Sequence, residues 1–285
     1  RILDSLFLLL QKVIPQRSLS ALCAWIAECR TPKWFKNSLI KVFIKIFDVD
    51  MHEASEVDVS KYANFNDFFT RSLRPGSRVI ANSDIVSPSD GVVSQFGFID
   101  RESLVQAKGR FFLLSELLAL EEKSAPKDFE YGAFLTIYLS PKDYHRFHMP
   151  VSGSVLSTCY VPGKLFSVND VTAKNLDNLY TRNERYIVNF AGANGRFAMV
   201  AVGAMIVAGI ETVWSGTVAS SRLVPKSCKY QYPEKRIHLD KGEEVGRFKF
   251  GSTIILLFPK DEINWEGNLR LGQRVKMGES IASYR

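Results

Sequence analysis

The first 75 residues carry apolar side chains at the spacing expected of helices. The predicted helices cover residues 2–14, residues 18–28, a segment that begins at Thr31-Pro32, and residues 65–73. Pro15 ends the first helix, and Ser18 or Ser20 can cap the second. Thr31 followed by Pro32 is a typical helix start, because proline suits the first helical turn. The beginning of the chain is therefore predicted to be a helical region.

The third of these helices is expected to be amphipathic, with lysines beside its apolar face. The apolar face comprises Trp34, Phe35, Leu39, Val42, Phe43, Ile46 and Phe47, and the lysines are Lys36, Lys41 and Lys45. This pattern is typical of a helix that lies in the plane of a membrane surface. A helix that packs on the protein's own core would show a similar face, so both interpretations stay open.

From Val79 onward the pattern changes to short apolar runs separated by Gly, Pro and Asp. The expected strands are residues 92–98, 134–139, 153–160, 186–190, 197–202, 205–212, 216–218, 246–250 and 253–258, with one helix at 114–122. Many short strands with frequent turns indicate a β-rich barrel or sandwich. The predicted fold class is α+β, with N-terminal amphipathic helices in residues 1–75 and a β-rich, barrel-sandwich-like domain in residues 76–285.

Two segments of the β-rich part repeat one another. Lys241-Gly-Glu-Glu-Val245 and Met277-Gly-Glu-Ser-Ile281 each have the pattern of a turn followed by a strand. Turns of this type occur in barrel-sandwich domains that carry biotin or lipoyl groups. Neither segment has a lysine in the exposed hairpin that such a carrier needs, so the repeat supports the fold and not a carrier function.

The charge of the chain is basic and concentrated near its start. The net charge is +7, and residues 1–47 hold eight Lys/Arg against two Asp/Glu, a balance of +6. A basic balance indicates an anionic partner. Large apolar residues lie among these charges and no nucleic-acid-binding motif is present, so a membrane surface is favoured over nucleic acid. No apolar stretch reaches the roughly 18–20 residues that a spanning helix needs.

Three polar islands carry the candidate chemistry. Asp90 lies in a turn before a strand, His145 and His148 lie in the string Asp143-Tyr-His-Arg-Phe-His-Met-Pro150, and Ser252 lies inside an apolar run. An aspartate, a histidine and a serine can together activate a hydroxyl, because the imidazole takes its proton and the carboxylate orients the imidazole. The G-x-S-x-G motif of many serine hydrolases is absent.

A metal site is not predicted. His145 and His148 are three residues apart, but no third ligand follows at a matching spacing. The four cysteines show neither CxxC nor Cys/His spacing, so free thiols are expected.

The bond between Gly251 and Ser252 is a candidate for self-cleavage. Glycine has no Cβ, so its carbonyl is open to attack by the Ser252 hydroxyl. Attack through a five-membered ring converts the amide to an ester. Elimination across Ser252 then cuts the chain and leaves a pyruvoyl group on the new N-terminus. The ketone of such a group can act as an electron sink.

Six blocks of the sequence form one ordered set. They are Pro88 with Asp90-Gly91, the string from Asp143 to Pro150, Tyr160-Val-Pro-Gly163 with Leu165-Phe-Ser-Val-Asn169, Arg182-Asn-Glu-Arg185, Val202-Gly-Ala-Met205, and Gly246-Arg-Phe-Lys-Phe-Gly-Ser-Thr253. In this combination the chain resembles bacterial phosphatidylserine decarboxylases, the pyruvoyl-dependent, membrane-associated type, over nearly its whole length. One departure is Phe250, where leucine is common in bacterial members; it keeps an apolar side chain.

The resemblance implies a particular processing and a particular set of site residues. The chain would cut itself between Gly251 and Ser252 into a large chain, residues 1–251, and a small chain, residues 252–285. Ser252 would become the covalent pyruvoyl cofactor. Asp90, His148 and Ser252 carry over as the triad associated with the cut, and His145 as the histidine linked to decarboxylation. The β-rich domain would then be the catalytic domain.

The resemblance also implies a reaction, a partner and a location. Phosphatidylserine in an anionic membrane would be converted to phosphatidylethanolamine and CO2 through a Schiff base between its amine and the pyruvoyl ketone. This is a step of phospholipid biosynthesis. It implies peripheral attachment at the cytoplasmic face of the bacterial inner membrane, and it is compatible with a homodimer.

Three other functions make different predictions. A pyruvoyl decarboxylase for a soluble amino acid shares the chemistry, but it has no use for apolar, basic helices. A non-catalytic membrane scaffold does not need Asp90, His145, His148 and Ser252. A serine hydrolase that uses Ser252 would react with fluorophosphonates and leave the chain uncut.

Overall fold

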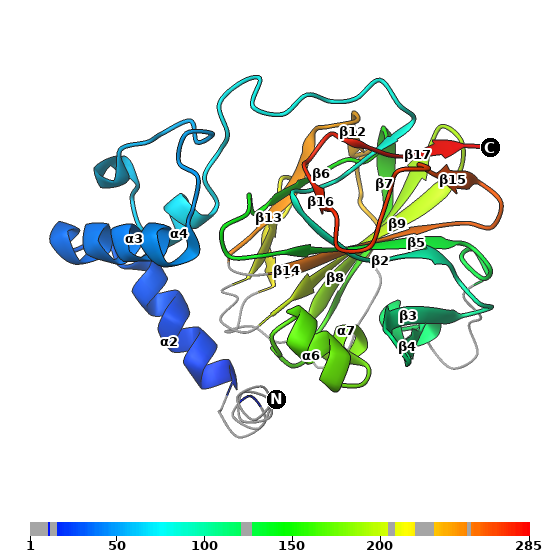
Figure 1. Ribbon diagram of the computed structural model, residues 1–285, viewed down its shortest axis with the longest axis horizontal. Helices are drawn as coiled ribbons and strands as arrows, with labels where there is room; N and C mark the ends of the chain where they lie inside the picture. Colours follow the sequence, from blue (N-terminus) through cyan, green and yellow to red (C-terminus); the bar gives the residue numbers. More distant parts are fainter. Residues whose placement is uncertain (1–10, 12–15, 121–126, 205–208, 220–230, 250–251) are drawn as a thin grey trace.

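The computed structural model describes residues 11, 16–120, 127–204, 209–219, 231–249 and 252–285 of the 285-residue chain (Figure 1). Nearly all of the helix expected at residues 2–14, the end of the one expected at 114–122, and Gly251 lie outside the described residues. In the described parts, helices come first and strands dominate from residue 85 onward. The α+β fold class is therefore confirmed.

The helices are α2 (Gln16–Glu28), α3 (Lys33–Phe47), the 3-10 helix η1 (Val59–Lys61), α4 (Phe65–Phe69), α5 (Leu114–Leu117), α6 (Asp170–Asn175) and α7 (Leu179–Arg182). The strands are β1 (Ile85–Val86), β2 (Gly91–Phe98), β3 (Ser103–Ala107), β4 (Arg110–Leu113), β5 (Ala133–Leu139), β6 (Arg146–His148), β7 (Gly153–Val161), β8 (Arg185–Gly192), β9 (Arg196–Gly203), β10 (Ile210–Thr212), β11 (Gly216–Ala219), β12 (His238–Leu239), β13 (Glu244–Phe248), β14 (Ser252–Phe258), β15 (Ile263–Trp265), β16 (Arg274–Val275) and β17 (Ser280–Tyr284).

The strands of the described residues form open antiparallel sheets, none of which closes into a barrel. The largest has the order β12-β7-β8-β9-β14-β5-β2-β16, and a second has the order β11-β10-β13-β6. A third contains β1, β17 and β15, and β3 pairs with β4. The chain passes from the second sheet to the largest one between β13 and β14, so the junction at Ser252 is also a crossing between sheets (Figure 1).

β14 lies inside the largest sheet and is buried along its whole length. Its neighbours are β5 and β9, which together bond both of its edges. Alternate side chains point to opposite faces of a strand. Ile254, Leu256 and Phe258 accordingly join one apolar cluster, and Ile255 and Leu257 join another. Apolar layers cover both faces, which explains why β14 reads as an unbroken apolar run.

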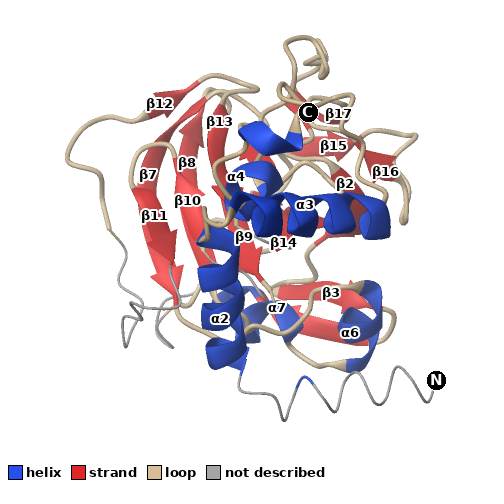
Figure 2. Ribbon diagram, turned by 90° about the vertical axis from the view of Figure 1, so that its left-hand side faces the viewer, coloured by secondary structure: helices blue, strands red, loops and turns tan. Residues whose placement is uncertain are grey.

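The helices α2, α3 and α4 lie together at one side of the strands (Figures 1 and 2). The Phe43 ring of α3 packs against three phenylalanines of α4, with centroids 5.1–6.0 Å apart: Phe65, Phe68 and Phe69. Ile40 is fully buried. Edge-to-face aromatic contacts of this kind add specificity to apolar burial. Part of the apolar face of α3 therefore serves the protein's own core.

The single apolar face expected for α3 is wrong in detail, because the helix has a buried and an exposed apolar side. Trp34, Val42 and Ile46 are 70%, 54% and 68% exposed. Lys36 is buried, and its Nζ donates to the carbonyls of Ser60 and Tyr62, so it does not border the exposed side. Viewed down the axis of this 15-residue helix, the apolar positions of the two sides lie next to one another. The sequence pattern alone therefore does not separate the buried side from the exposed side.

The cysteine prediction holds only in part. Cys23 and Cys29 are free thiols, as expected, whereas Cys159 is disulfide-bonded. The prediction is wrong for Cys159 because sequence spacing cannot reveal which cysteines approach one another in the fold. Among the described residues, no helix is long and apolar enough to cross a membrane.

Candidate active site

Ser252 is the first residue of β14 and is completely buried. It lies opposite Leu139 of β5 and Gly203 of β9. Its Oγ has no hydrogen-bond partner among the described residues. A buried hydroxyl without a partner costs about 1–3 kcal/mol, so such a group in a well-packed strand calls for an explanation. A hydroxyl kept free of competing bonds is suited to act as a nucleophile.

His145 is also fully buried and carries an unused lone pair. Its Nδ1 donates to the Asp143 carbonyl at 2.8 Å, so the neutral ring keeps its proton there and Nε2 is the acceptor. Nε2 has no partner in the described part of the chain. The Phe69 ring lies on the imidazole with centroids 4.0 Å apart. Burial, with the nearby Arg71 charge, lowers the pKa of His145 to about 3, so the ring is neutral at physiological pH.

The two histidines bond to residues at different distances along the chain from Ser252. The His145 carbonyl accepts from the Phe248 N–H at 2.9 Å, four positions before Ser252. His148 pairs with Glu244, eight positions before Ser252. Four residues of extended chain span at most about 14 Å, and eight span about twice that. The residue bonded to His145 is therefore closer to Ser252 along the chain than the residue paired with His148.

His148 is held at both ring nitrogens. Its Nδ1 donates to the Gly242 carbonyl at 2.9 Å, and its Nε2 accepts from the Tyr144 hydroxyl at 3.0 Å. Burial lowers the pKa of His148, so this ring is also neutral. Tyr144 is buried, and burial raises the pKa of its hydroxyl well above the usual range. Tyr144 therefore keeps its proton and donates a hydrogen bond to His148, a contact that the sequence did not predict.

Asp90 is buried and bonded, but not to a histidine. Its carboxylate accepts from Arg78 Nε at 2.9 Å and Arg78 Nη2 at 2.5 Å, and from the Met277 N–H at 2.9 Å. Arg78 also donates to Glu53. Among the described residues, no hydrogen bond joins Asp90, His148 and Ser252. The predicted residues share one region, but the hydrogen bonds of a triad are not formed in this conformation.

The two repeated turns each hold one part of this site. In the turn at Met277–Glu279, Gly278 N–H donates to the Ser87 carbonyl at 3.0 Å, and Ser87 N–H donates to the Glu279 carbonyl at 2.7 Å. The N–H of Met277, the first residue of this turn, donates to the Asp90 carboxylate. The repeat therefore orients the Asp90 carboxylate.

The second copy makes the same bonds with a different outcome. Gly242 N–H donates to the Met149 carbonyl at 2.9 Å, and Met149 N–H donates to the Glu243 carbonyl at 2.8 Å. Lys241 N–H donates to Ser152 Oγ at 2.9 Å, where the first copy has Asp90. The two copies are also joined, because His148 N–H donates to the Pro88 carbonyl at 2.7 Å and Val86 N–H donates to the Pro150 carbonyl at 3.0 Å.

A polar cavity of about 430 Å³ opens beside these residues. Asp90, Asp143, Tyr144, Arg71 and Arg78 contribute to its lining. Its walls carry both acidic and basic side chains, which suits a zwitterionic ligand. Arg71 and Arg78 were not predicted as site residues, because an arginine in a polar loop is usually solvated. Among the described residues, no cluster of three or more His, Cys, Asp or Glu is arranged to hold a metal ion.

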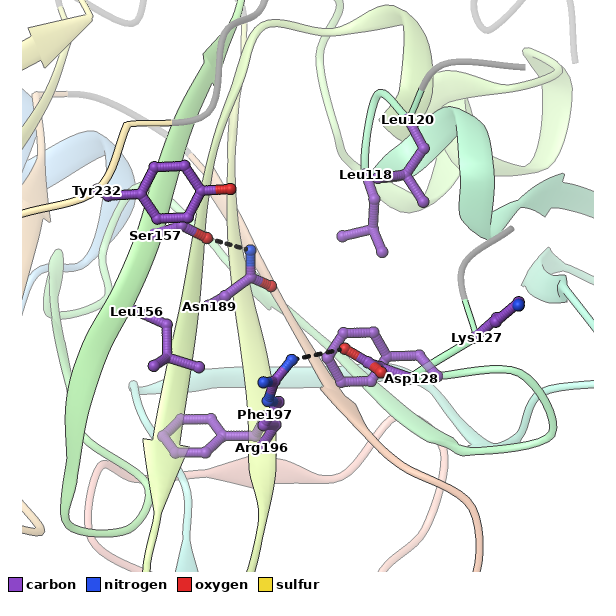
Figure 3. Close-up of a pocket in the computed structure, with 11 residues that line it drawn as sticks. Leu118, Leu120, Lys127, Asp128, Leu156, Ser157, Asn189, Arg196, Phe197 and Tyr232 are labelled. Atoms are coloured by element: carbon purple, nitrogen blue, oxygen red, sulfur yellow. Dashed lines mark hydrogen bonds and ion pairs between the residues drawn. The ribbon is translucent and has the colours of Figure 1, made fainter. Parts of the chain in front are cut away.

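Another cavity, of about 450 Å³, has Ser157, Asn189 and Arg196 among its lining residues (Figure 3). Two hydrogen bonds join residues that line it. Asn189 donates to the Ser157 hydroxyl at 3.0 Å, and Arg196 donates to the Asp128 carboxylate at 3.2 Å. Asn189 pairs with Ala198, which pairs with Leu257, five residues along β14 from Ser252. At 3.3–3.4 Å per residue the separation is about 17 Å. This cavity is therefore not the site of chemistry at Ser252.

Comparisons with known proteins assign the chain to a family. A family model described as phosphatidylserine decarboxylase matches residues 65–283, and one described as PSD matches residues 6–48. The chain is 48% identical over 282 residues to a phosphatidylserine decarboxylase proenzyme from Stutzerimonas stutzeri, covering 98% of this chain and 94% of the relative. It is 47% identical over 281 residues to the proenzyme of Saccharophagus degradans, covering 98% and 97%. The protein therefore belongs to the phosphatidylserine decarboxylase family.

Proposed function

We propose that this protein is a self-processing decarboxylase that converts phosphatidylserine to phosphatidylethanolamine and CO2. The observation that carries the proposal is the buried Ser252 at the start of β14, with an Oγ that has no partner in the described structure. Family membership supplies the substrate, because the relatives named above are phosphatidylserine decarboxylase proenzymes. The word proenzyme also fits a chain that is cut.

The cut itself follows from the chemistry of Gly251 and Ser252. Ser252 Oγ attacks the Gly251 carbonyl, and the C–N bond breaks as the acyl group moves from nitrogen to oxygen. Loss of a Cα proton of residue 252 then expels the Gly251 carboxylate and leaves a dehydroalanine. Water adds to it, ammonia leaves, and a pyruvoyl group remains at the N-terminus of residues 252–285. The large chain is then residues 1–251.

The buried start of β14 fits a pyruvoyl group. The neighbouring strands β5 and β9 hold the backbone of residue 252 on both sides. The Ser252 Oγ atom has no hydrogen-bond partner among the described residues, so no other bond competes for an oxygen at this position. A bound pyruvoyl ketone supplies an electron sink for the electron pair left behind by departing CO2. His145 can hold and return a proton at Nε2, because its Nδ1 proton is fixed by the Asp143 carbonyl.

We assign the cut to Asp90, His148 and Ser252, and the proton transfer of decarboxylation to His145, as the resemblance implies. Tyr144 occupies His148 Nε2 in this conformation, so His148 can accept a proton directly from Ser252 only after Tyr144 releases it. Asp90 stabilises a protonated His148 by its charge, since its carboxylate acts on the His148 pKa without touching the ring.

We further propose that residues 1–75 attach the enzyme peripherally to an anionic membrane, at the cytoplasmic face of a bacterial inner membrane, and that residues 76–285 form the catalytic domain. Support comes from exposed apolar residues of α2 and α3 beside exposed lysines: Leu22, Trp25, Trp34, Val42 and Ile46 with Lys41 and Lys45. Buried apolar area and lysine charge both contribute to binding at an anionic surface.

A vesicle experiment tests the membrane part. Replacing Trp25, Trp34 and Ile46 by serine should release the protein from phosphatidylserine-containing vesicles in co-sedimentation. Phe43 is left unchanged because it packs inside the protein, where its replacement would test folding instead. Leu271→Ser removes one exposed apolar side chain elsewhere and is the control. Unchanged sedimentation of the triple variant would refute the membrane assignment.

Intact mass tests the self-processing part. Freshly purified protein should consist of residues 1–251 and a 34-residue fragment, residues 252–285, whose N-terminus has the mass of a pyruvoyl group. The Ser252→Ala variant should remain one chain. The cut protein should release CO2 from phosphatidylserine vesicles, and the variant should not. A single uncut chain in both samples would disprove the proposal.

A further inference from the structure

The buried guanidinium of Arg71 has N–H groups without a hydrogen-bond partner among the described residues. Arg71 follows α4 and is 5% exposed. Its Nη2 donates to the Lys142 carbonyl at 3.2 Å, whereas Nε and Nη1 have no partner among the described residues. Arg71 also lines the polar cavity of about 430 Å³. A guanidinium is always charged in proteins, and its planar fork suits carboxylates and phosphates.

The carboxylates nearest to Arg71 are already bonded to other cations. Glu53 accepts from Arg78 and Lys276, and Asp90 accepts from Arg78. Asp143 accepts from Arg274 and from Ser140. Asp48, Asp50 and Glu279 also line the cavity, but Arg71 forms no ion pair in the described structure. Arg71 is therefore a buried cation with two nitrogens, Nε and Nη1, that can still donate hydrogen bonds to a ligand.

Arg71 lies next to the histidine assigned to decarboxylation. The guanidinium bonds the Lys142 carbonyl and the His145 ring bonds the carbonyl of the next residue, Asp143. Phe69, two residues before Arg71, lies on the His145 ring. Two consecutive carbonyls, of Lys142 and Asp143, thus bond the cation and the imidazole, and both of these residues line the cavity together with Arg71.

Other basic residues near the site are less suited to bind an anion. Arg146 Nη1 donates to Glu244 at 2.8 Å and its Nε to the Thr70 carbonyl at 2.9 Å. Arg78 is shared by Asp90 and Glu53. Lys164 is exposed and forms a backbone bridge to Asn183. Burial, unused donors and nearness to His145 coincide only at Arg71 among these residues.

We propose, building on the decarboxylase function above, that Arg71 binds the phosphodiester of the substrate head group. The head group offers two anions, a carboxylate and a phosphodiester. The carboxylate loses its charge as CO2 leaves, so a cation bound to it would stabilise the substrate more than the transition state. The phosphodiester keeps its charge throughout, and a cation bound to it improves binding without opposing the reaction.

Steady-state kinetics of cut enzyme separate these roles. Arg71→Gln should raise KM for phosphatidylserine in mixed micelles by about 10- to 100-fold and leave kcat within about threefold, as expected for a lost charged hydrogen bond. Arg71→Lys keeps the charge without the fork, so a smaller rise is expected, and this variant carries the test if Arg71→Gln does not fold. Arg74→Gln removes an exposed arginine three residues away and should change neither value.

A binding measurement identifies the anion without relying on catalysis. In the uncut Ser252→Ala chain, glycerophosphoethanolamine has the phosphodiester but no carboxylate. Its affinity should fall by the same 10- to 100-fold in Arg71→Gln. Inorganic phosphate is the second probe, and a loss confined to it would show a free-phosphate site instead of a head-group site.

Three results would overturn the inference. Unchanged glycerophosphoethanolamine binding in Arg71→Gln would mean that Arg71 binds the substrate carboxylate or has a structural role. A fall in kcat with unchanged KM would place its effect on His145. Unchanged KM and kcat would remove it from the site. Absence of the two fragments in wild-type protein would refute the decarboxylase proposal, while the binding result in the uncut chain would still decide the role of Arg71.

Discussion

The two repeated turns of this protein make the same backbone bonds, yet each contributes a different chemical group. In one copy the turn N–H meets the Asp90 carboxylate, and in the other it meets the Ser152 hydroxyl. At the position where one copy has His148, the other has the fully buried Val86. The backbone of a turn therefore provides positions, and chemistry arises where the copies differ in side chain.

The same comparison shows that the turns do not depend on the catalytic side chains. Each candidate residue is held by a turn that the other copy maintains with an ordinary residue, so the turn does not depend on the catalytic side chain. The bonds from His148 N–H to Pro88 and from Val86 N–H to Pro150 tie the copies together. The backbone near both candidate residues is thus held by bonds between the copies, whereas the bond from Tyr144 to His148 has to break before His148 can take the Ser252 proton.

The largest effect is expected from exchanging the distinguishing residue of one copy for that of the other. Asp90→Ser should abolish the cut and, in the Ser252→Ala background, destabilise the fold by about 3 kcal/mol, because it leaves Arg78 buried with one partner fewer. Ser152→Ala should cost about 1 kcal/mol and leave the cut intact. Intact mass and thermal unfolding measure both. Equal effects of the two variants would show that the copies do not differ in function.

The two histidines should separate the cut from the decarboxylation. His148→Asn is expected to leave an uncut chain, because the proton acceptor assigned to the cut is lost. His145→Asn should still yield the two fragments but release CO2 from phosphatidylserine at least about 100-fold more slowly, the contribution of a general acid or base. Intact mass and CO2 release on the same samples distinguish them. Fragments from His148→Asn and none from His145→Asn would exchange the two assignments.

Acid should destabilise the fold through His145. Burial lowers its pKa to about 3, whereas the unfolded chain has a value near 6.5. Below pH 6.5 the unfolded state therefore binds a proton that the folded state does not, and stability falls by up to about 1.4 kcal/mol per pH unit toward pH 3. Buried His148 acts in the same direction, and so does Glu53 at lower pH, where its Arg78 bond lowers its pKa to about 2.

Unfolding measured from pH 7 to pH 4.5 tests this linkage. His145→Asn should flatten the dependence, since asparagine does not titrate. His238→Asn replaces an exposed histidine and should leave the curve unchanged. An unchanged slope in His145→Asn would mean that the folded protein accepts a proton at this position.

The sequence predicted the fold where the apolar period was long and clear. The run at residues 253–258 was recognised as a strand, and β14 (Ser252–Phe258) is buried on both faces. Short elements such as α6 (Asp170–Asn175) and β3 (Ser103–Ala107) were missed, because polar residues interrupt both and neither has the unbroken apolar run of residues 253–258. The two faces of α3 were merged for the reason given above.

The candidate site was only partly predictable. Asp90, His145, His148 and Ser252 came from residue type and from family resemblance, and the repeat was visible in the turns. The hydrogen bonds of these residues could not be predicted. The bonds from Tyr144 to His148 and from Arg78 to Asp90 depend on which segments of the chain meet in space. No sequence pattern pointed to Arg71, since its burial and its unused hydrogen-bond donors become visible only in the folded structure.

The smallest effect should come from the glycines at corresponding positions of the two turns. Gly242 and Gly278 have φ of +86° and +91°, where a side chain is strained by about 1–2 kcal/mol. A Cβ at Gly242 would lie 2.9 Å from the Ile80 side chain, whereas at Gly278 it would lie 2.7 Å from the Val79 carbonyl oxygen. A side chain can move more easily than a backbone carbonyl. Gly278→Ala should therefore destabilise the fold more than Gly242→Ala.

Gly76→Ala supplies the matched control for this pair. Gly76 has φ of +79° and nothing within 4 Å of the added Cβ, so it reports backbone strain alone. Thermal unfolding in the Ser252→Ala background should rank the losses Gly76, Gly242, Gly278. If Gly278→Ala costs no more than Gly76→Ala, the segment at Val79 can move away from its turn. The turn that orients Asp90 would then be the more adaptable of the two copies, and its rigidity would have to come from Arg78 instead.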